Sequence, residues 1–343
     1  MKKAISILLA AAMLFCAAGA AIAEDGLSGQ CGENVFWSYD ADSGVLSVYG
    51  SGDMFNYDDD RDVPWYSFRE DVTGIDIAPG VTSVGDNTFY CCNAAYANVP
   101  DGVTYIGTYA FICCPFTEFY MPDSVTSTGF EVFSDCYQLE QVHLSVNLTA
   151  IEGFNFQNCY SLSQINIPDG VVSIGAYAFN NGRNLTHIEL PDSLETLYYS
   201  AFTGCGLTEV VIPAGVTQLY EGAFQFCYSL ERVEFLGPAP EFGERVFNEC
   251  SDGLTLYYHT SFEDSWAPNG ETTYCGYAIC PIHDIPGDLD GDGAVSFNDV
   301  SRLYLLLLGS GANSVLADFD GSGSVDFSDV SFMFMFIVGM QAA

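Results

Sequence analysis

The sequence predicts a mainly β protein: a repeat solenoid with an N-terminal β cap, followed by a small all-α domain. Three observations support this prediction. Phenylalanine recurs at a nearly constant spacing through the middle of the chain, from Phe89 to Phe247. Glycine, tyrosine and phenylalanine number 34, 21 and 26 among 343 residues, which favours strands joined by many turns. Near the C-terminus a pattern of aspartates and glycines occurs twice, and each copy precedes an apolar run of helical length.

The N-terminus has the three parts of a secretory signal. Lys2 and Lys3 are followed by an apolar run over residues 4–20, and then by the small-x-small sequence Ala21-Ile22-Ala23. A membrane anchor would need about 20 apolar residues and a stop-transfer flank. We therefore expect a signal peptide over residues 1–23, export of the mature chain, and no membrane span.

The charge of the chain excludes polyanion binding. The sequence has 45 acidic residues against 8 basic ones, and its two lysines lie in the predicted signal. Lys and Arg are the side chains that neutralise phosphates, so we expect no nucleic-acid partner.

A short repeat organises the middle of the chain. It is marked by phenylalanines at almost equal intervals, namely Phe89, Phe111, Phe133, Phe156, Phe179, Phe202, Phe224 and Phe247. A proline precedes most of them by about ten residues and follows a short alternating run, as in Gln164–Pro168 and Glu209–Pro213. Proline lacks the N–H needed to continue a ladder, so each run is predicted to be a strand that ends there. One such unit cannot bury its apolar face alone, whereas eight stacked units give a core roughly 40 Å long.

Cysteine follows seven of the eight phenylalanines by three residues, at Cys92, Cys114, Cys136, Cys159, Cys205, Cys227 and Cys250. Stacking would align these thiols in a column, which could be a metal or disulfide ladder. We favour a small buried apolar side chain in a tight corner, because the column lacks His and acidic residues. Among the other cysteines, Cys31, Cys91, Cys113, Cys275 and Cys280, pairing is more expected, and Cys275 with Cys280 is the first choice.

The repeat resembles the BspA-type leucine-rich repeats of bacterial surface and secreted proteins. Leu162–Phe179 and Leu207–Cys227 match the pattern L-x-x-I-x-I-P-x-x-V-x-x-I-G-x-x-A-F-x-x-C well. The resemblance covers residues 70–262, and residues 24–69 resemble the family's N-terminal cap, in which an aromatic β-hairpin shields the open end. It implies binding to proteins or surfaces and brings no shared catalytic residues. Residues 263–285 are expected to form a connector.

Residues 286–343 contain two loops with the spacing of calcium ligands. All eight acidic residues of this segment are aspartates, and they fall in the windows 288–299 and 318–329. Each window has oxygen-bearing side chains at positions 1, 3, 5 and 12 and glycine at position 6, which is the arrangement of a calcium loop. Position 12 is Asp rather than Glu, and neither loop has a convincing helix before it.

A loop followed by one helix, with both present twice over residues 286–343, resembles a type I dockerin. That family implies two calcium ions and binding to a cohesin module of a scaffold protein in the secreted cellulosome, which degrades polysaccharides. The implied calcium ligands are Asp288, Asp290, Asp292, Ala294, Ser296 and Asp299 in the first loop, and Asp318, Asp320, Ser322, Ser324, Asp326 and Asp329 in the second. Ala294 and Ser324 would use their carbonyls. The implied cohesin contacts are Phe297, Asn298, Tyr304, Leu305, Phe327, Ser328, Phe334 and Met335.

We expect no enzymatic activity. The four histidines lie far apart and are interpreted as ordinary surface or turn residues, and the sequence contains no nucleophile elbow or Walker loop. The expected function is docking to a scaffold while the repeats bind another protein or a cell or plant surface. The alternatives are a dockerin-borne hydrolase of O-glycosyl bonds and a passive spacer. The strand face is expected to present Tyr120, His143, Asn166, Glu189 and Val210, a mixture that suits no obvious sugar platform.

Overall fold

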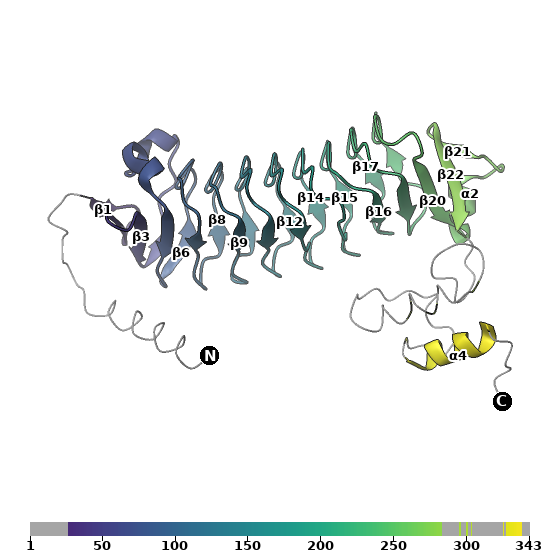
Figure 1. Cartoon of the computed structure of the whole chain (residues 1–343), viewed down its shortest axis with the longest axis horizontal. Helices are drawn as coiled ribbons and strands as arrows, with labels where there is room; N and C mark the ends of the chain where they lie inside the picture. Colours follow the sequence, from purple (N-terminus) through teal and green to yellow (C-terminus); the bar gives the residue numbers. More distant parts are fainter. Residues whose placement is uncertain are drawn as a thin grey trace. The chain divides into compact units, whose positions relative to one another are not determined.

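The computed structural model describes residues 27–282 and, beyond them, residues 295, 300, 303, 325 and 327–337. The chain divides into two compact units, residues 1–147 and 148–343, and each is described by itself. In both units the described part is mainly β, with short strands in stacked coils (Figure 1). None of the described helices has the length and apolar character needed to cross a membrane.

The described part of the first unit begins with an antiparallel meander. Strands β1 (Ser28–Gln30), β2 (Val35–Asp40) and β3 (Val45–Gly50) pair in order, which confirms the predicted N-terminal hairpin. Strand β3 then pairs in parallel with β5 (Gly74–Ile77), and β5 pairs with β7 (Ala97–Asn98). The cap thus continues directly into the sheet of the repeats. Two 3-10 helices, η1 (Asp60–Asp62) and η2 (Tyr66–Asp71), lie between β4 (Gly52–Asp53) and β5.

Trp65 joins the cap to the repeat core. Its ring is 1% exposed and lies 5.6 Å from the ring of Trp37 and 5.6 Å from that of Phe89. Its indole N–H donates to the backbone oxygen of Thr88 at 2.7 Å, which satisfies the polar atom of a buried aromatic residue. Trp65 therefore ends the phenylalanine column of this unit.

The coils of the first unit contribute two further sets of parallel strands. One sheet has the order β10-β8-β6-β4, with β6 at Val81–Val84, β8 at Tyr105–Ile106 and β10 at Ser127–Thr128. The other set pairs β9 (Glu118–Tyr120) with β11 (Gln141–His143) in register. In each coil the inward residues are apolar, so stacking buries what one coil cannot bury alone.

The second unit repeats this arrangement. One sheet has the order β12-β14-β15-β17-β19, with strands at Ala150–Ile151, Ser173–Ile174, Thr196–Leu197, Gln218–Leu219 and Glu241–Phe242. The other contains β16 (Glu209–Ile212), β18 (Arg232–Phe235) and β20 (Thr255–His259) in parallel. Pro213 follows the last residue of β16, as predicted, whereas β13 is shorter than expected and covers only Gln164–Ile165.

Residues 263–282, which the sequence predicts to be a connector, instead add to the second sheet of this unit. After η3 (Thr260–Phe262) come α2 (Glu263–Trp266), β21 (Thr273–Tyr274) and β22 (Tyr277–Ile282), and β22 pairs in parallel with β20. The Trp266 ring is buried and lies 4.7 Å from that of Phe235. An aromatic cluster therefore covers the end of these coils.

The repeat phenylalanines form columns of stacked, buried rings. In the first unit Phe89, Phe111 and Phe133 follow one another at 5.4 and 5.9 Å. In the second unit Phe179 is 1% exposed, lies 5.3 Å from Phe156 and 5.1 Å from Phe202, and is nearly parallel to both. The predicted register of the repeat is confirmed.

The cysteine column has the structural role that the sequence favours. Six of its seven members are buried, and Cys250 is half-buried. The thiols of Cys114 and Cys205 donate to the carbonyl oxygens of Phe89 and Phe179 in the preceding coil, at 3.3 and 3.1 Å. Cys275 and Cys280 both have free thiols, so the expected pair Cys275–Cys280 is not formed. Cys275 lies in the turn between β21 and β22, whereas Cys280 lies inside β22 opposite Tyr257.

Candidate functional site

The strands that end at the prolines present every second side chain outward. In β16 the four residues alternate exposed, buried, exposed and buried. Val210 is 2% exposed and faces the core, whereas Val211 is 44% exposed. The expectation that Val210 lies on the surface is therefore wrong. The outward residue lies two positions before the proline, as Asn166 does before Pro168, so before Pro213 it is Val211.

In the first unit the outward positions of β9 and β11 form a compact group, the Glu118 cluster, made of Glu118, Tyr120 and His143. The Tyr120 hydroxyl donates to Glu118 Oε1 at 2.7 Å, and His143 Nε2 lies 3.0 Å from the same oxygen. The Tyr120 and His143 rings stack in parallel with their centres 4.2 Å apart. Hydrogen bonds from Tyr120 and then His143 lower the pKa of the Glu118 carboxyl. The side chain of Tyr120 is held in place although it is 60% exposed.

In the second unit β18 and β20 carry a more buried group, the Glu234 cluster, made of Arg232, Glu234, Tyr257 and His259. The Glu234 carboxylate lies 3.1 Å from Arg232 Nη2 and 3.4 Å from His259 Nε2. The Arg232 guanidinium also lies 3.8 Å from the centre of the Tyr257 ring, within the range of a cation–π contact. Burial raises the pKa of the Glu234 carboxyl, but hydrogen bonds from His259 and Arg232 outweigh this, so the pKa is lowered overall.

This lowered pKa predicts a pH-dependent contribution to stability. A carboxyl whose pKa is lower in the folded state contributes stability above its unfolded pKa, about 4.3, and loses it as the pH falls through the folded value. Glu234→Gln should therefore lower the unfolding free energy by roughly 1–3 kcal/mol at pH 7 and by much less at pH 3. Urea denaturation at both pH values measures the difference. Glu189→Gln, whose side chain is 75% exposed, is the control, and an equal loss from Glu234→Gln at both pH values would contradict the assignment.

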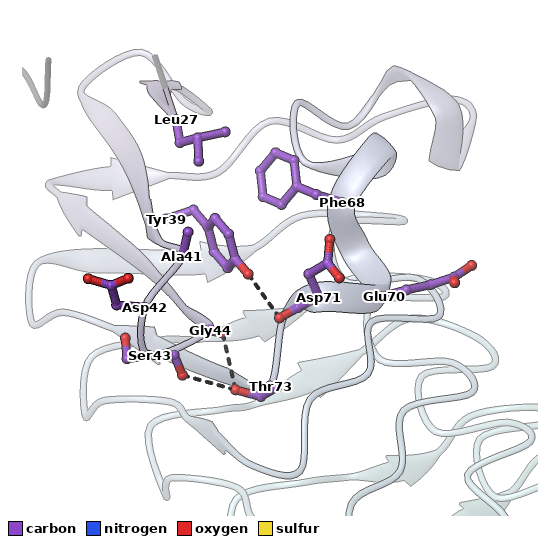
Figure 2. A pocket seen from close by; sticks show the side chains of 10 residues that line it. All are labelled: Leu27, Tyr39, Ala41, Asp42, Ser43, Gly44, Phe68, Glu70, Asp71 and Thr73. Carbon is purple, nitrogen blue, oxygen red and sulfur yellow. Dashed lines mark hydrogen bonds between the residues drawn. The ribbon is translucent and has the colours of Figure 1, made fainter. Parts of the chain in front are cut away.

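A shallow depression of about 660 Å³ lies on the cap, between the β2–β3 turn and η2 (Figure 2). Tyr39 and Phe68 line it, together with the acidic residues Asp42, Glu70 and Asp71. The Tyr39 hydroxyl donates to the backbone oxygen of Asp71 at 2.9 Å, as Figure 2 shows. Since this hydroxyl already ties the hairpin to the end of η2, its bond stabilises the cap, and we assign the depression no ligand.

Most of the residues predicted to bind calcium or a cohesin lie outside the described residues. Of the calcium ligands, Asp329 is described, and it is fully buried in the first turn of α4 (Phe327–Ile337). Of the cohesin contacts, Ser328 and Phe334 are exposed on the same helix, whereas for Phe327 and Met335 the structure describes only the helical backbone. Within the described residues, no group of three or more His, Cys, Asp or Glu side chains could hold a metal ion.

A small apolar cluster links the two copies of the C-terminal pattern. Leu303 and Met333 are fully buried and form its centre. Four partly buried valines pack against it, namely Val295, Val300, Val325 and Val330. Each residue from the first copy has its counterpart 30 positions later, so equivalent positions of the two copies pack into one core.

Sequence reasoning does not single out the groups on the strand faces. It interprets His143 and His259 as ordinary surface or turn residues, but each lies beside a glutamate on the face of a sheet. The outward alternation of the strands is the signal that could have found them. It places Glu118 and Tyr120 on one face of β9, and Arg232 and Glu234 on one face of β18.

Comparison with known proteins identifies one family. Residues 63–172 and 149–264 match the model of the BspA type leucine rich repeat region, in six copies. Among solved structures, a leucine-rich repeat protein from Bacteroides ovatus is 22% identical with a TM-score of 0.49, covering 73% of this chain and 77% of its own. One from Eubacterium ventriosum is 20% identical with a TM-score of 0.39, covering 76% and 86%. The leucine rich repeat protein of T. pallidum is 22% identical with a TM-score of 0.45, covering 71% and 96%. None of the curated proteins matches the chain.

Proposed function

Because the chain belongs to the BspA-type leucine-rich repeat family, we propose that it is an exported, non-catalytic protein whose strand face binds another protein or a cell or plant surface. The observation that carries this proposal is the Glu118 cluster. Its tyrosine is more than half exposed, yet it is stacked on His143 and hydrogen-bonded to Glu118. An exposed aromatic side chain that is already ordered loses little conformational entropy on binding, which suits an interface anchor.

We propose a protein partner with a cationic side chain at this position. The chain carries a net charge of −37, so a basic partner surface is favoured electrostatically. Glu118 keeps a lowered pKa and is ionised at neutral pH. A partner arginine or lysine could approach this carboxylate while an apolar group covers the Tyr120 ring.

A selection of phage-displayed peptides against the full chain tests this proposal. We expect the selected peptides to contain basic and aromatic residues and to lose at least tenfold in affinity for the double variant Tyr120→Ala/His143→Ala. The matched control is Tyr228→Ala, which removes a 68% exposed ring from a turn of the second unit. Peptides that bind the double variant as tightly as the unmodified chain would show that the Glu118 cluster is not the binding surface.

The C-terminal segment supports a second, independent proposal: calcium-dependent docking to a cohesin module in a cellulosome. The calcium-loop spacing of the two aspartate windows carries it. The apolar cluster supports it, because equivalent residues of the two copies pack into one core, as two loop–helix copies in one domain would. The buried carboxylate of Asp329 is consistent with position 12 of a calcium loop, where it would fold back onto the ion. When bound, one calcium ion in each loop would offset part of the negative charge of its aspartates.

Truncating the two loop phenylalanines should show whether only one loop–helix copy binds the cohesin or whether either copy can bind it. If one copy contacts the cohesin, Phe327→Ala should weaken binding about thirtyfold or more, because truncating an aromatic anchor typically costs about 2 kcal/mol or more, and Phe297→Ala should have little effect. If either copy can bind, both single changes should be mild and the double change severe. We expect unequal use with the Phe327 copy favoured. Calorimetry against a cognate cohesin measures this, and a double variant that binds normally would contradict recognition by these residues.

The alternative that the chain hydrolyses glycosidic bonds has a direct test. Such enzymes use a pair of carboxyl groups facing a bound sugar. We expect the full chain to release no reducing sugar from plant polysaccharides. Sustained release that survives repurification would overturn the non-catalytic proposal.

A further inference from the structure

Two cysteines occupy backbone positions where cysteine is unfavourable. Cys91 and Cys113 each lie two residues after a repeat phenylalanine, and both have left-handed backbone angles, with φ of 52° and 60°. A residue with a Cβ pays an energetic cost there, and Asn, Asp and Gly tolerate the conformation best. In most other repeats the same position is indeed one of these types: Asp135, Asn158, Asn181 and Gly204. Cysteine at two consecutive repeats therefore calls for a reason other than backbone preference.

The backbone places the two residues side by side. The N–H of Cys91 donates to the oxygen of Ile112, and the N–H of Phe89 donates to that of Ala110, both at 2.9 Å. These bonds run between adjacent coils at the spacing of a parallel sheet, which brings equivalent Cα atoms to about 4.8 Å. A disulfide requires a Cα separation of roughly 4.4–6.8 Å, so the two coils can be bridged at this position.

The side chains of Cys91 and Cys113 interact with each other, and both are partly exposed. The interaction with Cys113 lowers the pKa of Cys91 against the effect of burial, and the guanidinium of Arg69 lowers it further. Of the two, Cys91 is thus the better nucleophile.

We propose that Cys91 and Cys113 form a reversible disulfide between two neighbouring coils, with a low-molecular-weight disulfide as the oxidant. The Cys91 thiolate attacks one sulfur of the oxidant and releases the first thiolate, which leaves a mixed disulfide on Cys91. Cys113 then loses its proton and attacks the Cys91 sulfur, which releases the second thiolate. The protein loses two electrons and two protons, and the oxidant becomes two thiols.

The neighbouring column of cysteines makes the reaction selective. Cys92 and Cys114 are buried, and the Cys114 thiol donates to the oxygen of Phe89. Burial raises the pKa of Cys92 to about 12, and it raises that of Cys114 as well. Since the thiolate is the reactive form, these buried thiols should stay reduced under conditions that oxidise the outer pair.

In the test, the full chain is incubated with oxidised glutathione and the remaining thiols are blocked. The chymotryptic peptides are then mapped by mass spectrometry. We expect a linked pair of peptides, one containing Cys91 and the other Cys113, that has lost two hydrogen atoms and separates after reduction. In Cys91→Ser and in Cys113→Ser, the amount of this linked pair should be at least tenfold lower than in the unmodified chain. In Cys113→Ser, glutathione should instead remain attached to Cys91.

The double variant Cys92→Ala/Cys114→Ala is the matched control, because it removes the adjacent buried pair from the same two peptides. It should form the linked pair as the unmodified chain does, and circular dichroism checks that it is folded. Three outcomes would each overturn the proposal. The link could be lost in a folded control, it could persist in Cys91→Ser, or Cys91 and Cys113 could be found blocked but unlinked after oxidation.

Discussion

Replacing Phe179 with alanine should lower the free energy of unfolding of the second unit by about 3–5 kcal/mol, as removal of a buried phenylalanine does. Phe179 is 1% exposed and stacks between Phe156 and Phe202 with ring centres 5.3 and 5.1 Å away. The rings on either side are fixed by their own coils and cannot move in to fill the space. The variant should therefore keep a cavity in the middle of the column.

Urea denaturation followed by tryptophan fluorescence measures this effect. Trp266 is buried at the end of the same unit, between Phe235 and Tyr258, and its emission should change when these coils separate. Tyr228→Ala is the matched control, because it removes an aromatic ring that is 68% exposed. An unchanged denaturation midpoint for Phe179→Ala would show that the column does not stabilise the coils.

The repeat could be predicted because its signal recurs. A phenylalanine at one position means little, but eight at nearly constant spacing require equivalent environments, and stacking is the arrangement that provides them. The cysteine three residues later could be interpreted in the same way. Six of the coils use it as a small buried side chain, and in several coils its thiol also satisfies a carbonyl of the preceding coil.

The contacts on the strand face could not be predicted from the period alone. Whether a residue points inward depends on an alternation of two along the strand, so an error of one position in choosing the equivalent residue reverses the prediction. Val211 lies two positions before Pro213 and is exposed, whereas Val210 is buried. The Glu118 and Glu234 clusters each depend on side chains from two strands of successive coils, and such a contact is visible only when the register between the coils is known.

The pairing of cysteines illustrates the same limit. Cys275 and Cys280 are near in sequence, but a tight turn and a strand separate them, so their thiols stay free. Cys91 and Cys113 are far apart in sequence, yet they occupy equivalent positions of adjacent coils whose backbones are hydrogen-bonded there. In a solenoid, the distance along the chain between two equivalent residues says less about contact than the number of coils between them.

Chelation of calcium should unfold residues 286–343 while leaving the repeat units folded. The two loops contain eight aspartates, whose mutual repulsion opposes folding without a cation. The segment is short and has little core to resist this repulsion. Each bound ion stabilises the folded form by mass action, by about 2.7 kcal/mol when free calcium is 100 times the dissociation constant.

Limited proteolysis of the full chain with and without chelator measures this difference, and circular dichroism should record a gain of helix on adding calcium. With calcium the chain should resist cleavage after residue 286, whereas with chelator cleavage should concentrate there and spare residues 27–282. Asp288→Asn/Asp318→Asn should be cleaved in calcium as the chelated chain is, because position 1 of each loop loses its charge. Glu189→Gln, an exposed change in the repeats, should leave the pattern unaltered. Identical cleavage and identical spectra in calcium and chelator would mean that these loops fold without the ion, and the docking proposal would then lose its physical basis.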